Sequence, residues 1–427
     1  MDRFSYRQGE LYCEDVPVRR IAEAVGTPTY VYSAGTIEDH YRAVADAFAP
    51  VNPLICFSIK SCQNIHILKR LVALGAGMDV VSGGELYRAS RAGADPAKIV
   101  YAGVGKTDPE IIQALDAGIG WFNVESEAEL ANLCAIAAAR RQKVRAALRV
   151  NPDVDPKTHR HTTTGKKETK FGVDLERARR VFEQFARDAW VQLIGIHLHI
   201  GSPVFQAEPY LEAIAKALGL IDQLRGDGFA IDTLNIGGGY AASYRDDQAP
   251  TFESYARKIV PLLASRGLRI ILEPGRSIAA NAGILVTRTQ FVKQGGDKQF
   301  VIVDGAMTDL IRPALYDAFH FAWPVRCDER FVPPSRGADL VLPGTVEVDI
   351  VGPVCESSDY LAKGRHLPPV RRGDLIAVFT AGAYGFVMAS HYNSRPNAAE
   401  VLVNGDRMQT IRRRETYEDL TEAEEKP

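Results

Sequence analysis

Lys60 ends the apolar run Pro-Leu-Ile-Cys-Phe-Ser-Ile-Lys, and its position is the first sign of chemistry in this sequence. A lysine that is partly removed from water has its charged form disfavoured, so a neutral, nucleophilic amine becomes accessible. Such an amine can form a Schiff base with an aldehyde cofactor or a carbonyl substrate. Taken alone, a lysine at a strand end is more often a surface residue whose charged tip reaches water. The neighbouring motifs must therefore decide whether Lys60 is a reactive amine or an ordinary surface lysine.

Two motifs, Asn-Ile-Gly-Gly-Gly-Tyr and Glu-Pro-Gly-Arg, follow successive apolar runs and indicate a phosphate site. Their candidate residues are Gly237, Gly238, Gly239, Glu273, Gly275 and Arg276. Consecutive glycine N–H groups can approach an anion without obstruction by a Cβ atom. When three consecutive glycines stand alone, a tight turn explains them about as well as a phosphate site does. Together with a lysine at another run end, the two motifs form a strong combination.

The elements that must position these residues alternate between residues 29 and 275. Eight short runs rich in β-branched or bulky apolar residues predict buried parallel strands. The runs are Leu54–Ser58, Met78–Val81, Ile99–Ala102, Gly120–Val124, Val144–Val150, Ile194–Ile200, Thr233–Ile236 and Arg269–Leu272. Amphipathic segments between them predict helices, for example Asn64–Leu74, Glu85–Ala92, Ser126–Ala139 and Tyr255–Ser265. Polar residues and glycines collect at the C-terminal ends of the runs, which favours an α/β fold of the (β/α)8 TIM-barrel type over an open doubly wound sheet.

After about residue 280 the pattern changes to short, partly alternating segments separated by glycine and proline, which predicts an all-β sandwich or barrel. The expected strands are Ile284–Phe291, Gln299–Val303, Leu340–Leu342, Thr345–Val351, Leu375–Phe379 and Ala399–Val403. We therefore expect a barrel over residues 27–280, a β domain over residues 281–410 that residues 1–26 join, and a polar tail over residues 411–427.

Composition argues against several classes of protein. The chain has 51 basic and 53 acidic side chains, so it lacks the basic excess of a nucleic-acid or membrane-surface binder. Its first residues carry no secretory signal, and no window approaches the roughly 20 apolar residues of a membrane span. The six cysteines form no CxxC pair, and His197 and His199 have no acidic partners nearby in sequence, so no metal site or disulfide framework is predicted. We expect a cytoplasmic enzyme.

The motifs around these residues resemble the fold-type III pyridoxal-phosphate-dependent decarboxylases over residues 27 to 404. The resemblance rests on FSIKS with Lys60, DVVSGGE with Asp79, HLHIGS with His199, and on NIGGG, EPGRS, CESSD (Cys355–Asp359) and GAYG (Gly382–Gly385). Within this class the chain is most similar to the diaminopimelate decarboxylases. That similarity rests on three longer blocks, Thr164–Val173, Arg312–His320 and Met388–Val403.

The resemblance implies pyridoxal 5'-phosphate as the cofactor. Lys60 would hold its aldehyde, and Glu273 would keep the pyridine nitrogen protonated, so that the ring accepts electrons strongly. The residues implied to bind the cofactor are Lys60, Asp79, His199 (stacked on the ring), Ser202, Gly237, Gly238, Gly239, Glu273, Gly275, Arg276 and Tyr384. Cys355 would donate a proton after carbon dioxide leaves, which makes Lys60 and Cys355 the catalytic residues. Without the resemblance, Glu273 could instead pair with Arg276, and Cys355 could be a buried apolar residue.

The resemblance also implies the substrate. A carboxylate at the far end of a substrate needs a fixed cation, and the fork of arginine suits it best. The residues implied to bind substrate are Arg276, Arg312 and Tyr316 for a distal carboxylate, Glu356 for a distal ammonium group, and Tyr384. An arginine and a glutamate together favour meso-2,6-diaminopimelate, which would yield L-lysine and carbon dioxide in the last step of lysine biosynthesis. The family shares each site between two subunits, so a homodimer is implied.

Three alternatives stay open on the sequence alone. The first is a sister decarboxylase acting on ornithine, arginine or carboxynorspermidine, the second a racemase, and the third a non-catalytic homologue that binds a protein partner. Glu273 disfavours a racemase, where an arginine would suit better, and the joint presence of Lys60, Glu273 and Cys355 argues against a non-catalytic chain. The chain departs from the commonest family pattern at Phe57, Ser58, Cys62 and Pro203, none of which removes a group that the chemistry needs.

Overall fold

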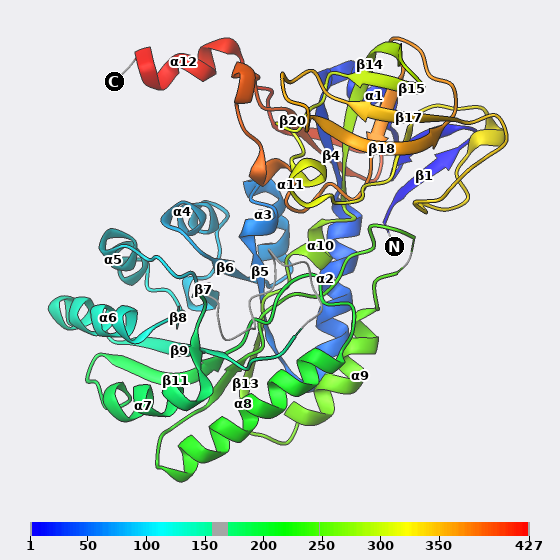
Figure 1. Cartoon of the computed structure of the whole chain (residues 1–427). Helices are drawn as coiled ribbons and strands as arrows, with labels where there is room; N and C mark the ends of the chain where they lie inside the picture. Colours follow the sequence, from blue (N-terminus) through cyan, green and yellow to red (C-terminus); the bar gives the residue numbers. More distant parts are fainter. Residues whose placement is uncertain (1, 156–169, 247, 426–427) are drawn as a thin grey trace. The chain divides into compact units, whose positions relative to one another are not determined.

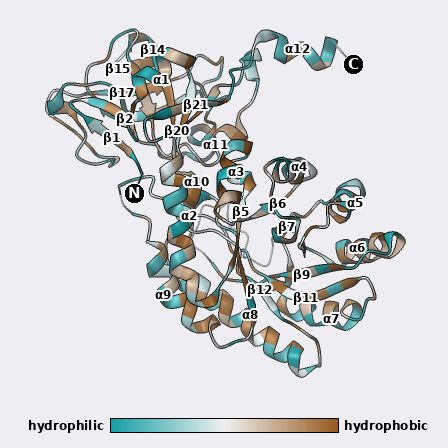
Figure 2. Cartoon of the chain, turned by 180° about the vertical axis from the view of Figure 1, so that it is seen from behind, coloured by the Kyte–Doolittle hydropathy of each residue, from teal (hydrophilic) through white to brown (hydrophobic). Residues whose placement is uncertain are grey.

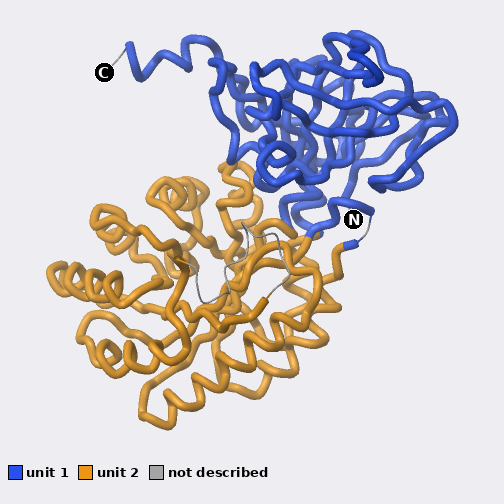
Figure 3. The backbone as a smooth tube through the Cα atoms, in the orientation of Figure 1, with its two compact units in different colours: residues 1–39, 242–248, 278–427 blue, residues 40–241, 249–277 orange. Residues whose placement is uncertain are grey.

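The computed structural model describes residues 2–155, 170–246 and 248–425 (Figure 1). The chain divides into two compact units, coloured separately in Figure 3. The barrel unit comprises residues 40–241 and 249–277, and the β-rich unit comprises residues 1–39, 242–248 and 278–427.

Eight parallel strands close the barrel in the order β5–β6–β7–β8–β9–β11–β12–β13, with β13 paired back to β5. They are β5 (Leu54–Ser58), β6 (Gly77–Val80), β7 (Ile99–Tyr101), β8 (Trp121–Val124), β9 (Val144–Asn151), β11 (Val191–His197), β12 (Thr233–Asn235) and β13 (Arg269–Leu272), and the short β10 (Val173–Asp174) pairs with β9. The predicted (β/α)8 fold is confirmed, and each predicted run overlaps a strand. The largest shift is in β11, which begins three residues before the predicted run because buried Val191 and Leu193 flank exposed Gln192 in strand alternation.

Helices follow the barrel strands and carry hydrophobic and hydrophilic residues, as Figure 2 shows for α8 and α9. They are α3 (Ile65–Ala73), α4 (Gly83–Arg91), α5 (Asp108–Asp116), α6 (Glu127–Arg140), α7 (Leu175–Phe185), α8 (Glu208–Gly226) and α9 (Phe252–Leu263). Serine caps begin two of them: Ser82 accepts from the N–H of Glu85, and Ser126 accepts from the N–H of Glu129. Each glutamate side chain in turn accepts a backbone N–H just before the serine, from Val81 or Glu125. These reciprocal caps hold the turns that leave β6 and β8.

The β-rich unit contains a sheet ordered β18–β17–β15–β14–β4–β20–β21, in which β19 also pairs with β14 and β16. Its strands are β4 (Thr29–Ser33), β14 (Gly283–Gly295), β15 (Lys298–Val303), β16 (Ala322–Pro324), β17 (Val346–Val351), β18 (Tyr360–Leu367), β19 (Leu375–Val378), β20 (Ala399–Asn404) and β21 (Arg407–Arg412). A separate N-terminal sheet consists of β1 (Phe4–Arg7), β2 (Glu10–Cys13) and β3 (Val16–Pro17). The remaining α-helices among the described residues are α1 (Val18–Val25), α2 (Ala34–Phe48), α10 (Arg276–Ala279), α11 (Arg312–Tyr316) and α12 (Tyr417–Glu425).

The second sheet differs from the sequence-based expectation in several details, among them the short strand β16, which was not predicted. The strand predicted at Leu340–Leu342 is wrong: Val341 is 59% exposed, and the segment enters a turn in which the Thr345 N–H bonds to the Leu342 carbonyl. The outermost strands β18 and β21 were not predicted, because strands at a sheet edge carry charged side chains that mask the apolar pattern. Strand pairing places β4 beside β14 and β20, although the expected barrel limit of residue 27 includes it. A fully buried strand has the same apolar sequence in either sheet.

No helix among the described residues is long and apolar enough to cross a membrane.

Candidate active site

Lys60 lies directly after β5, in a short 3-10 turn, and its Nζ donates to Asp79 Oδ2 at 3.0 Å. Asp79, in β6, is fully buried, and the Ser58 hydroxyl donates to the same oxygen. Burial raises the pKa of Asp79 above its usual value, and the Lys60 ammonium offsets only part of this rise. The other oxygen, Oδ1, is buried and accepts no hydrogen bond from any residue that the structure describes. The lysine amine, whose side chain is 36% exposed, is thus held at the carboxyl end of the barrel by a buried counter-ion.

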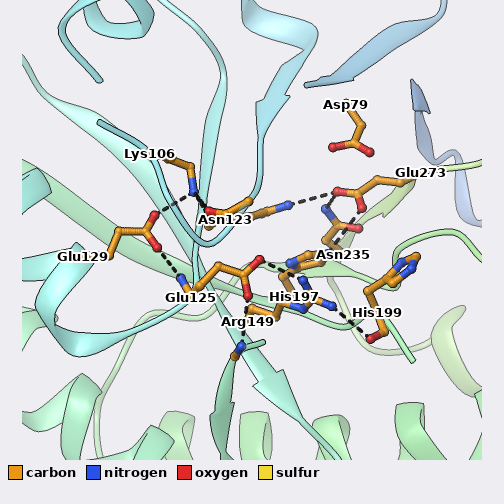
Figure 4. Close-up of polar contacts among 12 residues, drawn as sticks. Asp79, Lys106, Asn123, Glu125, Glu129, Arg149, His197, His199, Asn235 and Glu273 are labelled. Carbon is orange, nitrogen blue, oxygen red and sulfur yellow. Dashed lines mark hydrogen bonds and ion pairs between the residues drawn. The ribbon is translucent and has the colours of Figure 1, made fainter. Parts of the chain in front are cut away.

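Glu273 follows β13, and its carboxylate is buried among polar groups from other strands (Figure 4). Its Oε1 accepts from Asn123 Nδ2 at 3.0 Å and from Asn235 Nδ2 at 2.6 Å. Its Oε2 lies 3.4 Å from His197 Nε2. Burial alone would raise the pKa of Glu273, but the His197 ring and the Asn235 hydrogen bond help to hold it well below its usual range. The barrel therefore contains a fixed, ionised carboxylate.

His199 lies just beyond the end of β11, with its ring beside the triple glycine. The Gly238 N–H donates to His199 Nδ1 at 3.4 Å. Burial lowers the pKa of His199 well below its usual value, and the Arg149 guanidinium lowers it further. The ring is accordingly neutral at physiological pH, and a flat, uncharged imidazole is suited to stacking on another ring.

Two further buried ion pairs hold the strand ends that carry these groups (Figure 4). Arg149, in β9, donates from Nη1 to Glu125 Oε1 at 2.8 Å and from Nη2 to the His199 carbonyl at 3.3 Å. Lys106 donates from Nζ to Glu129 Oε1 at 2.6 Å and to the Asn123 carbonyl at 2.8 Å. Through these bonds, the ion pairs fix the backbone of Asn123, which contacts Glu273, and of His199, which lies beside the glycines.

The glycine loops are closely packed, and none of their four glycines, Gly237, Gly238, Gly239 and Gly275, can be replaced without a shift. A Cβ atom at Gly238 would overlap the carbonyl oxygen of Glu273, and one at Gly275 would come within 2.9 Å of Ser58 Cβ. Gly239 has a φ of +100°, which side chains rarely allow. Beside these loops, Arg276 Nε donates to Ser202 Oγ at 3.0 Å. The backbone here is bare of side chains, as an anion cradle requires.

These groups fit pyridoxal phosphate. The barrel end offers an amine for the aldehyde, an anionic carboxylate for a protonated ring nitrogen, and glycine loops for the phosphate. Asp79 Oδ1 and Ser277 Oγ are buried and lack partners within the described ranges, so polar atoms remain to be satisfied by a bound group. Across the described chain, no cluster of three or more His, Cys, Asp or Glu side chains is arranged to hold a metal ion.

The remaining predicted residues lie in the β-rich unit. Arg312 and Tyr316 are the first and last residues of α11, and Arg312 is only 7% exposed. Tyr384 lies in a loop after β19 with a left-handed φ of +55°. Cys355, which is exposed, and Glu356 lie in the loop between β17 and β18.

That loop is held by side chains on either side of the cysteine. The Cys355 N–H donates to Asn393 Oδ1 at 2.9 Å. The buried Asp359 carboxylate accepts at 2.6 Å from the N–H groups of Val354 and Met307. Residues 164–169 of the Thr164–Val173 block lie outside the described residues.

Sequence reasoning missed the groups that hold Glu273 and the strand ends. Asn123 and Arg149 do not belong to any recognised motif, and Lys106 lies in a loop. Their signal was present: each of the first two is a buried polar residue flanked by apolar residues in its strand, and such a residue needs a buried partner. His197 was considered only as a lining residue or a metal ligand, whereas its ring faces Glu273.

Comparison with known proteins agrees with this geometry. A family model described as "Pyridoxal-dependent decarboxylase, pyridoxal binding domain" matches residues 34–280. Fold and site together define a barrel-type pyridoxal-dependent decarboxylase, as the resemblance predicted.

Curated relatives narrow the class further. The chain is 49% identical to the diaminopimelate decarboxylase of Pseudomonas aeruginosa over 98% of both chains. It is 47% identical to that of Aquifex aeolicus, over 98% of this chain and 96% of the relative. The crystal structure of diaminopimelate decarboxylase from Helicobacter pylori complexed with L-lysine superposes with a TM-score of 0.89 at 39% identity, covering 96% of this chain and 99% of the other. The chain belongs to the diaminopimelate decarboxylase family.

Proposed function

We propose that this protein decarboxylates meso-2,6-diaminopimelate to L-lysine and carbon dioxide with pyridoxal phosphate, the last step of lysine biosynthesis. The observation that carries the proposal is the buried Glu273 carboxylate, which accepts hydrogen bonds from the amides of Asn123 and Asn235 and whose pKa its neighbours hold below the usual range. An ionised carboxylate keeps a pyridine nitrogen protonated, which is what loss of carbon dioxide from an amino acid requires.

Within the barrel unit the roles divide by chemistry. When bound, pyridoxal phosphate supplies an electron sink for the electron pair of the carbon–carbon bond that breaks. Lys60 Nζ would bind the cofactor aldehyde, and Glu273 would hold the proton on the ring nitrogen. His199 would stack on the ring face. The further residues of this unit that are proposed to hold the cofactor are Asp79, Ser202, Gly237, Gly238, Gly239, Gly275 and Arg276. Tyr384, which belongs to the β-rich unit, is proposed to hold it as well.

Within the β-rich unit the proposed roles are proton donation and substrate reading. Loss of carbon dioxide leaves an electron pair on carbon, and Cys355 Sγ would supply the proton that this carbon takes up. Arg312 and Tyr316, with Arg276, would bind the carboxylate at the far end of the substrate. Glu356 would bind the ammonium group there. A substrate that lacks the far carboxylate would leave a buried guanidinium unpaired, which is costly.

We further propose a homodimer in which the loop around Cys355 serves the barrel of the partner copy. Cys355 is exposed on its own chain, and so is Tyr392, which precedes the Asn393 that accepts from the Cys355 N–H and is 46% exposed. A proton donor, however, must work in a closed site. Mixing Lys60→Met and Cys355→Ala variants tests this. Shared sites predict recovery of about one quarter of wild-type activity, because half of randomly paired dimers carry one intact site. No recovery would argue for sites built within one chain.

A cytoplasmic location is also proposed, in keeping with six cysteines that form no disulfide with one another. Fractionation of the source cells would test it, and recovery outside the cytoplasmic fraction would contradict it.

The decisive experiment measures carbon dioxide release from meso-diaminopimelate with and without added pyridoxal phosphate, beside ornithine, arginine and carboxynorspermidine. We expect cofactor-dependent release from diaminopimelate alone. Arg312→Ala should abolish this turnover, whereas the matched control Arg371→Ala, at a side chain 91% exposed, should not change it. Release only from another of these substrates would overturn the proposed roles of Arg312 and Glu356.

A further inference from the structure

His320 is a completely buried residue of the β-rich unit that contacts the arginine proposed to read the substrate. Arg312 Nε donates to His320 Nε2 at 3.3 Å, and His320 Nδ1 lies 2.9 Å from the Phe379 carbonyl oxygen. A carbonyl only accepts and a guanidinium only donates, so Nδ1 must carry the proton and Nε2 must carry the lone pair. Both neighbours therefore select the same neutral tautomer of His320.

Two aromatic rings border the same guanidinium. Arg312 Cζ lies 5.1 Å from the centre of the Tyr244 ring and 5.7 Å from that of Tyr316. The Tyr244 ring meets the His320 ring edge-on, with centroids 5.4 Å apart and an interplanar angle of 87°. Within the described part of the chain, the Arg312 guanidinium donates one hydrogen bond, and it does so from Nε rather than from a terminal amino group. The contacts thus engage the stem side of the guanidinium and leave its terminal amino groups for a ligand.

We propose that His320 is a positioning residue for substrate recognition, which orients Arg312 before the far carboxylate binds. A bidentate arginine–carboxylate pair needs the planar fork in one orientation, and a hydrogen bond to Nε fixes that plane without occupying the two terminal amino groups. The acceptor must be neutral and must present a lone pair, which the bond from Nδ1 to the Phe379 carbonyl secures. His320 acts through Arg312 and does not touch the substrate. The inference rests on the proposed role of Arg312.

The matched variants His320→Gln and His320→Met test this role, because the two side chains are similar in size and only glutamine has an acceptor oxygen. The methionine variant should raise KM for diaminopimelate about tenfold, in keeping with the loss of one hydrogen bond to a charged group. Its kcat should stay within about twofold, and the glutamine variant should lie between methionine and wild type. The affinity for pyridoxal phosphate and the absorbance of the bound cofactor should not change.

Product inhibition gives a readout that a general structural role would not produce. L-Lysine keeps the carboxylate that Arg312 would bind, whereas cadaverine lacks it. The methionine variant should therefore weaken inhibition by L-lysine about tenfold and leave inhibition by cadaverine unchanged. Equal KM values for the two variants, or equal weakening of both inhibitors, would overturn the proposal.

An Arg312→Lys background covers the case in which the methionine variant does not fold. Lysine has no Nε–H to donate to His320, so His320→Gln should have no further effect on KM in that background. An equal effect in both backgrounds would refute the positioning role. Wild-type assays separate the two hypotheses: no turnover of diaminopimelate by the wild-type chain refutes the proposed function, whereas turnover with unchanged KM in the variants refutes only the role of His320. L-Lysine binding by calorimetry tests that role even without turnover.

Discussion

Replacing Arg149 with methionine should destabilise the barrel unit strongly, because it leaves a buried carboxylate without its cation. The side chains of Arg149 and Glu125 are 8% and 2% exposed. Removing one partner of such a pair costs about 3–5 kcal/mol in the free energy of unfolding. Glu125 keeps a hydrogen bond from the Gly172 N–H at 2.9 Å, which favours the lower end of that range. A cost of about 3 kcal/mol corresponds to a fall in Tm of roughly 6–12 °C for a unit of about 150–250 residues.

The loss should also depend on pH. Burial raises the pKa of Glu125, but the Arg149 guanidinium and the His197 ring bring it below its usual value. In the wild type, this stabilisation is present above the unfolded pKa and is lost as pH falls through the lowered folded pKa. Without Arg149 the burial effect prevails and the pKa rises, so acid neutralises the unpaired carboxylate and relieves its cost. The difference in Tm between wild type and variant should therefore be larger at about pH 8 than at about pH 5.

Thermal unfolding followed by circular dichroism measures these differences. Arg177→Met is the matched control, because it breaks an ion pair with Glu127 of the same length, 2.8 Å, at a side chain 51% exposed. It should cost less than about 1 kcal/mol. Adding Glu125→Gln to Arg149→Met should restore part of the stability, since it removes the uncompensated charge. Equal Tm losses for the buried and exposed arginines, or a larger difference at low pH, would refute the reasoning.

Three further changes test the site. Glu273→Gln should keep the fold and the cofactor but lower kcat at least about 100-fold, because an amide cannot hold a proton on the ring nitrogen; absorbance spectra and steady-state kinetics would show it. Gly238→Ala should weaken cofactor binding more than about tenfold in an absorbance titration, whereas Gly219→Ala, with open space around its Cβ, should not. Asp359→Asn loses one acceptor for the N–H groups of Val354 and Met307, so it should lower kcat while cofactor affinity stays unchanged; equal losses of both would contradict this.

The barrel strands could be predicted from the sequence because their signal is local. A strand buried on both faces must be a short apolar run, and two predicted runs, Leu54–Ser58 and Arg269–Leu272, coincide with β5 and β13. The edge strand β18 carries Lys363 and Arg365, so the same rule could not find it. Likewise, every residue of β4 is buried, and nothing local distinguishes a barrel strand from a central strand of the second sheet.

The candidate site likewise has residues that the sequence pattern indicates and partners that it does not. Lys60, the glycine loops and Glu273 stand next to apolar runs, so their order along the chain already indicates one end of a barrel. The partners of Glu273 come from β8, β11 and β12, and the acceptor for Arg312 is a histidine eight residues further on. No spacing rule selects such partners among the polar residues of the chain.

The sequence by itself therefore determined the class of fold and the cofactor, and it predicted the residues that would hold this cofactor, because each of these depends on residue type and on short-range pattern. Only the tertiary structure decided the ionisation of Glu273, the neutral state of His199 and the tautomer of His320. These properties depend on burial and on the charges and hydrogen bonds supplied by residues far apart in the chain, and such neighbours exist only once the chain has folded.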